Sequence, residues 1–141
     1  MNVTVLRGDL AGLETPLLAV PVFEGAAADP AVAALDRALG GMITAVMERG
    51  DLRGKEGDAV VLYPTGGSAA ATRVQLIGVG RPEAITTEKL RKAGGTAAKA
   101  AGKARSPRVT FVLPATSLDT AAAARAVAEG VVMGSYSFTE L

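Results

Sequence analysis

The amino-acid sequence predicts an α/β domain, in which helices pack against a β-sheet. Short β-like runs alternate with longer alanine-rich segments of helical spacing, and this alternation is typical of layered α/β domains. A length of 141 residues suits one core, so we expect residues 1–141 to form a single domain. Apolar residues make up 49% of the chain but aromatic residues only 4%, so the core must consist mainly of Ala, Val and Leu.

The first half of the chain is predicted to contain two strands and two helices. Residues 3–6 form a weak strand pattern, and the apolar run Leu17–Val22 is typical of a strand covered on both faces. The pair Asp29-Pro30 predicts a helix start, because Asp caps free N–H groups and proline fits the first helical position. Gly40-Gly41 should divide the helical pattern in two. Gly50 should end the second helix, since glycine adopts the left-handed conformation beyond a helix end.

The second half is predicted to contain three strands and two helices. Val60–Leu62 and Val74–Val79 are strand candidates that a turn could join as a hairpin. A helix capped by Thr86 or Thr87 should run to about Ala104, with small residues on its inner face. Val109–Leu113 is the fifth strand. The last helix should begin near Asp119 and end at Gly134.

The composition excludes several kinds of chemistry. The chain has no Cys and no His, so thiolate and histidine metal sites, cysteine nucleophiles and Ser-His-Asp triads are absent. Lys plus Arg total 15 and Asp plus Glu 14, a balance that gives no reason to expect nucleic acid or an acidic membrane as partner. No apolar run approaches the roughly 20 residues of a membrane span. We therefore expect a cytoplasmic location, no membrane partner, and no catalysis by this chain alone.

Two glycine-containing loops are candidate ligand sites. Gly78 and Gly80 follow a predicted strand, as in a turn that holds phosphate, and Thr65, Gly66 and Gly67 have the composition of a loop that wraps a ligand. A dinucleotide motif, however, needs a third glycine and immediate entry into a helix, and the chain has neither here. We therefore interpret both loops as ordinary turns.

A basic segment between residues 89 and 108 is a third candidate site. It holds seven basic residues and no acidic one, and several of them should share the outer face of a helix, where they could follow a phosphate backbone. The candidate face consists of Lys89, Arg91, Lys92, Lys99 and Lys103. No aromatic residue is interleaved for base stacking, and no recognition motif surrounds the segment, so a solvated helix face is the preferred interpretation.

Several segments, in their order and spacing along almost the whole chain, resemble the N-terminal domain of the leucyl aminopeptidase, or cytosol aminopeptidase, family. These segments are Val22–Gly25, Gly50–Lys55, Val74–Gly80 leading into Thr87–Arg91, Ala128–Gly130, and Gly134–Tyr136 with Phe138. The resemblance implies a three-layer α/β/α fold like that of macro domains, with a central mixed sheet of about five or six strands flanked by helices.

The resemblance also implies a larger parent protein. The family's catalytic domain is C-terminal, so it is expected after residue 141, and it holds two divalent metal ions, zinc or manganese, through acidic residues and a lysine. Full-length members assemble as homo-hexamers. No catalytic or metal-binding residue can be assigned in this chain, because the family's Asn-Thr-Asp-Ala-Glu-Gly-Arg type of segment is absent.

Three hypotheses of function follow. In the preferred one, the chain is a non-catalytic domain of a leucyl aminopeptidase that removes N-terminal residues from peptides, and it serves assembly, access to the active site or partner binding. The first alternative is a macro-domain-like module that binds a nucleotide or ADP-ribose through Gly66, Gly67, Gly78 and Gly80. The second is nucleic-acid binding through the basic helix, which nothing in the sequence singles out.

Overall fold

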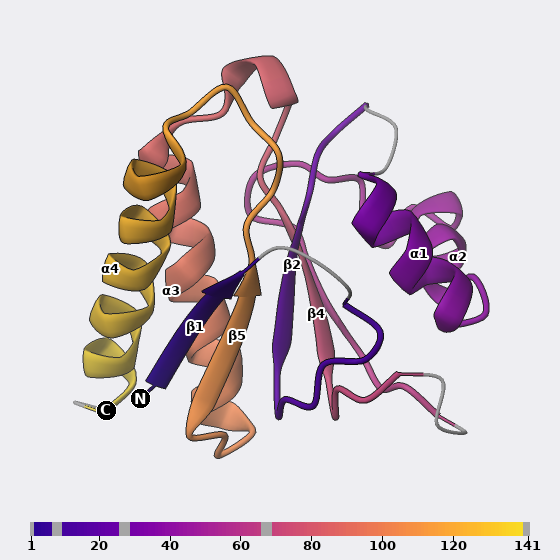
Figure 1. The fold of residues 1–141 in the computed structure, drawn as a ribbon, viewed down its shortest axis with the longest axis horizontal. Coiled ribbons are helices and arrows are strands. Elements are labelled where there is room, and N and C mark those ends of the chain that lie inside the picture. Colours follow the sequence, from indigo (N-terminus) through magenta and orange to yellow (C-terminus); the bar gives the residue numbers. More distant parts are fainter. Residues whose placement is uncertain (1, 7–9, 26–28, 66–68, 140–141) are drawn as a thin grey trace.

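A five-stranded sheet forms the centre of the structure, with α3 and α4 on one face and α1 and α2 on the other (Figure 1). The computed structural model describes residues 2–6, 10–25, 29–65 and 69–139. The strands are β1 (Asn2–Leu6), β2 (Leu18–Val22), β3 (Ala59–Leu62), β4 (Val74–Gly78) and β5 (Arg108–Val112). The helices are α1 (Pro30–Ala38), α2 (Met42–Glu48), α3 (Thr87–Lys103) and α4 (Thr120–Thr139), and a short 3-10 helix, η1 (Pro82–Ala84), precedes α3. The predicted three-layer α/β/α fold is confirmed.

The sheet is mixed, with the strand order β1-β5-β2-β4-β3. β1, β5, β2 and β4 run parallel to one another, and β3 pairs antiparallel with β4, so the predicted hairpin is confirmed. Every residue of β2 and β4 is buried, as expected for strands that helices cover on both faces. β3 is different, because only Leu62 of its four residues is buried. Both edge strands are therefore less covered than the central ones, since none of residues 2–5 of β1 is buried either.

Local signals set the ends of α1 and α2 as predicted. The Asp29 carboxylate caps α1 by accepting a hydrogen bond from the N–H of Ala31 at 2.9 Å, and Pro30 occupies the first helical position. Gly41 has a φ of +84°, in the left-handed region, where the chain turns from α1 into α2. The Asp36 carboxylate then accepts a hydrogen bond from the N–H of Ile43 at 2.8 Å. Gly50, with a φ of +79°, follows α2.

Small residues let α3 and α4 pack backbone to backbone. A Cβ atom at Gly94 of α3 would overlap the carbonyl oxygen of Val127 in α4, and one at Gly130 of α4 would overlap the carbonyl oxygen of Arg91 in α3. Ala97 and Ala98 of α3 are fully buried. The helical glycines thus allow the two backbones to approach closely. This packing offsets the cost of glycine in a helix, which is about 1 kcal/mol relative to Ala.

The predicted end of the last helix at Gly134 is wrong, because α4 continues to Thr139. Gly134 lies inside the helix, where α4 passes α3. A Cβ atom there would be 2.9 Å from the Cβ of Ala98 and from the carbonyl oxygen of Gly95, both in α3. This glycine is therefore required by the neighbouring helix, and it does not mark a helix end.

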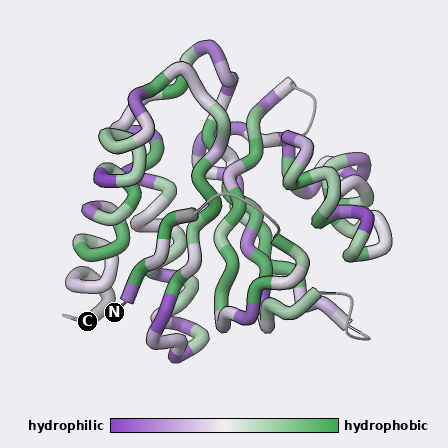
Figure 2. The backbone as a smooth tube through the Cα atoms, viewed as in Figure 1, coloured by the Kyte–Doolittle hydropathy of each residue, from purple (hydrophilic) through white to green (hydrophobic). Residues whose placement is uncertain are grey.

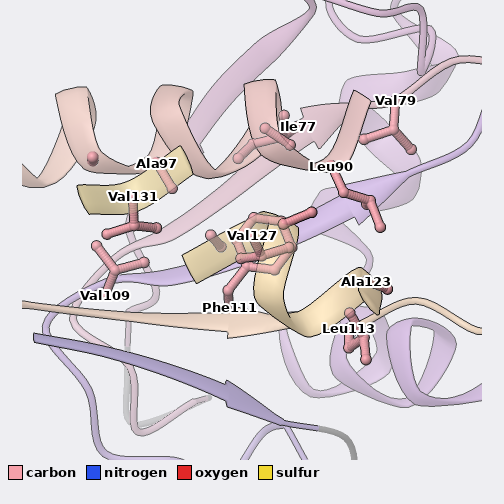
Figure 3. Packing of buried hydrophobic residues seen from close by; sticks show 14 of the residues in the cluster. Ile77, Val79, Leu90, Ala97, Val109, Phe111, Leu113, Ala123, Val127 and Val131 are labelled. Carbon is pink, nitrogen blue, oxygen red and sulfur yellow. The ribbon is translucent and has the colours of Figure 1, made fainter. Parts of the chain in front are cut away.

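The sheet separates two hydrophobic clusters, and the strands carry most of the hydrophobic colour in Figure 2. Between the sheet and α3–α4, Val109 and Phe111 of β5 point toward Val127 and Val131 of α4 (Figure 3). Phe111 is the largest fully buried side chain. The cluster beneath α1 and α2 consists mainly of Leu, Val and Ile. The core therefore has the predicted composition of Ala, Val and Leu with little aromatic content.

No single helix in the described part of the chain is long and apolar enough to cross a membrane. α1 and α2 meet the length and composition criteria only when taken together, and they are bent by 103° at the break between them. Their inner residues, which include Leu35 and Ile43, are buried in the core.

Candidate functional site

The turn at Gly78–Gly80 uses its backbone N–H groups inside the protein. The N–H of Gly78 donates to the carbonyl of Asp58 and that of Gly80 to the carbonyl of Gly54, both at 2.8 Å, while Val79 donates to Val22 at 3.1 Å. A phosphate cradle needs N–H groups that are free to face the ligand. In this structure the three N–H groups are engaged in holding strand ends together.

Close packing gives a structural reason for a glycine in this turn. A Cβ atom at Gly78 would overlap the backbone of Gly54 and Lys55, which cross over the end of β4. Gly54 itself has a φ of +83°, and a Cβ there would lie 2.6 Å from the carbonyl oxygen of Phe23. These contacts join the ends of β2 and β4 to the segment before β3, and they require no ligand.

The two glycine loops do not meet in the described part of the structure. Thr65 follows β3 and is exposed, while Gly66 and Gly67 lie outside the described residues. Leu62 pairs with Val74 at one end of β4, whereas Gly78 lies at the other end. Thr65 and the Gly78–Gly80 turn therefore flank opposite ends of the same strand.

The basic residues in the first half of α3 interact with groups that lie outside the basic segment 89–108. The guanidinium of Arg91 donates to the carboxylate of Glu129 in α4 at 3.0 Å and also to that of Glu88, and these hydrogen bonds raise the pKa of Arg91. The ammonium of Lys92 lies 3.5 Å from the carboxylate of Glu56. The ammonium of Lys89 donates to the carbonyl of Ala84 at 3.0 Å.

The second half of α3 borders a groove of about 570 Å³ against the β3 edge of the sheet. Lys99 and Lys103 line it from α3, Tyr63 from the end of β3, and Arg73 and Gln75 from the start of β4. β3 and β4 pair so that Val61 lies opposite Gln75, and this places alternate residues of both strands on the face toward α3. The structure thus brings together Lys99 and Lys103, two residues of the predicted basic face.

Sequence reasoning missed this groove, although it contained one signal for it. Gln75 is the only polar residue in the predicted strand Val74–Val79. A polar side chain in a buried strand requires a hydrogen-bond partner, within the protein or on a ligand. The hairpin of β3 and β4 was predicted, but its register and the position of α3 beside it, which bring Tyr63 and Arg73 next to Lys99 and Lys103, could not be read from any local pattern.

A model of the N-terminal domain of the cytosol aminopeptidase family matches residues 19–141 of the chain. This chain belongs to the cytosol aminopeptidase family. The resemblance seen in its sequence segments is thereby confirmed.

Curated relatives of this family domain agree with the match. The probable cytosol aminopeptidase of Roseiflexus castenholzii is 32% identical over 99% of the chain, and that of Alkalilimnicola ehrlichii is 34% identical over 100%. The chain spans only 26% and 29% of these two relatives. It therefore corresponds to the N-terminal domain and to about a quarter of the relatives' length.

Solved structures place the domain in the same fold. A tomato leucine aminopeptidase variant superposes with a TM-score of 0.78 and 26% identity, over 96% of the chain and 28% of that protein. The macrodomain of Mycobacterium tuberculosis DarG superposes with a TM-score of 0.68 and 16% identity, over 93% of the chain and 90% of that domain. The second likeness shows the fold alone, and it confirms the predicted macro-domain-like architecture.

Cytosol aminopeptidases are metallopeptidases, and the described residues of this domain do not fit a metal centre. No three or more His, Cys, Asp or Glu side chains gather within this part of the chain. Several of its carboxylates have other roles, because Asp29 and Asp36 cap helices and Glu129 binds Arg91.

Proposed function

We propose that this chain is the non-catalytic N-terminal domain of a metal-dependent leucyl aminopeptidase that removes N-terminal residues from peptides. The observation that carries the proposal is that nearly all of the chain aligns with only about a quarter of cytosol aminopeptidases. The remaining three quarters of such an enzyme would hold the active site with its two zinc or manganese ions. The whole enzyme is proposed to act in the cytoplasm.

The proposed role of the domain is to contact its own catalytic domain and to support assembly of the enzyme as a homo-hexamer. The outer surface of α4 supports a contact role. Val132, Met133 and Tyr136 are 49%, 62% and 69% exposed, and together they form an apolar patch near the end of the helix. Apolar surface of this kind is typical of contacts with other protein surfaces.

The experiment compares two proteins, the 141-residue chain and the protein encoded by the complete reading frame. Each is purified and assayed with a leucine anilide in the presence of Mn²⁺ or Zn²⁺. We expect turnover from the full-length protein and none above a buffer blank from the 141-residue chain. Turnover by the short chain would place the active site within it and overturn the proposal.

A second test addresses the contact role in the full-length protein. Met133→Asp places a charge in the apolar patch, and Arg125→Asp places the same side chain at another exposed position of α4. We expect Met133→Asp to shift sedimentation toward smaller species or to lower activity, and Arg125→Asp to do neither. Equal behaviour of both variants would contradict a role for the patch.

Neither alternative function gains support at the residues that the sequence predicted for it. The N–H groups of the Gly78–Gly80 turn are engaged within the protein, which disfavours a phosphate cradle there. The first half of α3 carries carboxylates beside Arg91 and Lys92, so the basic face is interrupted by negative charge. We therefore propose neither a nucleotide site at the glycine turn nor a nucleic-acid face along α3.

A further inference from the structure

The groove between α3 and the β3 edge combines features that the packing of the fold does not explain. Its floor consists of alternate residues of β3 and of the segment from Arg73 to Gln75 at the start of β4, and its wall is the second half of α3. A volume of about 570 Å³ is within the range of small-molecule sites, which is roughly 300–1,000 Å³. The groove belongs neither to the glycine turn nor to the apolar patch on α4.

The groove is cationic. Arg73, Lys99 and Lys103 line it, no acidic residue does, and none of the three takes part in an ion pair found among the described residues. By contrast, Arg91 and Lys92 on the same helix both pair with carboxylates. Three cations without anionic partners around one concave surface favour an anion, most of all a phosphate, which accepts several charge-assisted hydrogen bonds.

Gln75 adds an independent observation. Its side chain lines the groove, the residue is 3% exposed, and its Oε1 has no hydrogen-bond donor among the described residues. An unpaired buried carbonyl is unfavourable for folding, so a glutamine in a strand of otherwise apolar residues requires an explanation. Oε1 itself is buried, and the last torsion of a glutamine side chain is broad, so turning the carboxamide over brings the oxygen to the groove and moves Nε2 to the buried position. A ligand that carries an N–H donor would satisfy this oxygen.

Tyr63 supplies an aromatic surface at one end of the groove. Its side chain is 60% exposed, and the guanidinium of Arg73 lies 6.0 Å from its ring centre. An exposed tyrosine ring beside an arginine is suited to stacking against a flat, electron-rich ring.

We propose that this groove binds a nucleoside monophosphate. The phosphate faces Lys99 and Lys103, an N–H group of the base donates to Gln75 Oε1, and the base lies against Tyr63. The site is distinct from the glycine turn, and it does not depend on the enzymatic activity proposed for the full-length protein.

The test uses the folded 141-residue chain in low-salt buffer and measures binding of AMP, adenosine and inorganic phosphate by calorimetry. We expect AMP to bind more tightly than either adenosine or phosphate, because only AMP engages both the cations and Gln75. The double variant Lys99→Gln/Lys103→Gln should weaken AMP binding by at least about tenfold, which corresponds to about 1.4 kcal/mol. Lys92→Gln, on the same helix but paired with Glu56, should leave AMP binding unchanged.

Gln75→Met separates the proposed site from a general anion surface. It keeps the length of the side chain and removes the acceptor, so AMP binding should weaken while phosphate binding stays unchanged. Thermal unfolding of each variant confirms that it is folded. If AMP binds no more tightly than phosphate and Gln75→Met has no effect, the groove binds an adventitious ion only and the proposal fails.

A third arm separates a free nucleotide from a nucleic-acid strand, which offers the same phosphate and base. A short single-stranded oligonucleotide is titrated under the same conditions. Tighter binding of AMP than of the strand, per nucleotide, supports the proposal. Binding of the strand without detectable binding of AMP would overturn it and assign the groove to nucleic acid.

Discussion

The two sides of α3 differ in what their small and polar residues do. On the side toward α4, glycines bring two backbones into contact, and a Cβ atom at Gly94 or Gly130 would overlap a carbonyl oxygen. On the side toward β3, Lys99 and Lys103 of the helix border a groove that Gln75 of β4 also lines. One helix can therefore stabilise the fold through one face and line a groove with another.

The largest expected effect is at the helix contact. Gly130→Ala places a Cβ atom onto the backbone of Arg91, which cannot move without separating α3 from α4. We expect a loss of about 3 kcal/mol in the free energy of unfolding, at the upper end of the range for overpacked sites. Urea unfolding monitored by circular dichroism measures it.

A matched control is the neighbouring glycine on α3. A Cβ atom at Gly95 would lie 3.6 Å from the carbonyl oxygen of Gly130, an ordinary contact distance. Gly95→Ala should therefore stabilise the protein by up to about 1 kcal/mol through higher helix propensity. If Gly95→Ala and Gly130→Ala destabilised the domain equally, close packing could not explain the glycines.

The next effect, of opposite sign, is expected in the groove. Gln75→Met removes a buried carbonyl that has no partner among the described residues, and it keeps a side chain of similar size. We expect the free energy of unfolding to rise by about 1 kcal/mol, because the unsatisfied group is unfavourable in the folded state. A lower midpoint of urea unfolding in Gln75→Met would show that Gln75 has a structural partner.

The smallest effect is expected at the ion pairs of α3. Arg91→Gln removes the bonds to Glu88 and Glu129 on the protein surface, so we expect a small loss of stability that decreases as salt is added. Hydrogen bonds to Glu129 and Glu88 raise the pKa of Arg91. The stability that such a basic group contributes is present while it is protonated, and it is lost only when the pH rises through the raised pKa. The effect of Arg91→Gln should therefore be the same across the neutral pH range, where Arg91 stays charged. Thermal unfolding at low and high salt measures it, and a loss unaffected by salt would contradict this account.

The positions of most elements could be predicted from the sequence because their signals are local, whereas the three-layer arrangement was expected from the family resemblance. The apolar run of β2, the cap at Asp29 and the left-handed glycine at Gly50 each act within a few residues, and each was confirmed. Gly134 shows the limit, since a glycine that ends a helix and one that admits a neighbouring helix look the same in sequence. Only the position of α3 distinguishes them.

The candidate sites were harder to predict because partners come from distant segments. The run from Lys89 to Arg108 contains no acidic residue, yet Arg91 meets Glu129, 38 positions away, and Lys92 meets Glu56, 36 positions away. The groove likewise depends on strand pairing that brings Tyr63 and Arg73 beside α3. The sequence therefore shows how many basic residues the segment holds, but only the fold shows which of them have acidic partners.

The proposed function places the metal chemistry of the whole enzyme outside the 141-residue chain. Elemental analysis after dialysis against Zn²⁺ or Mn²⁺ and removal of free metal tests it most directly, on both the short chain and the full-length protein. We expect about two bound ions per subunit in the full-length protein and no stoichiometric metal in the short chain. Zinc or manganese retained by the short chain at one ion per molecule would contradict it.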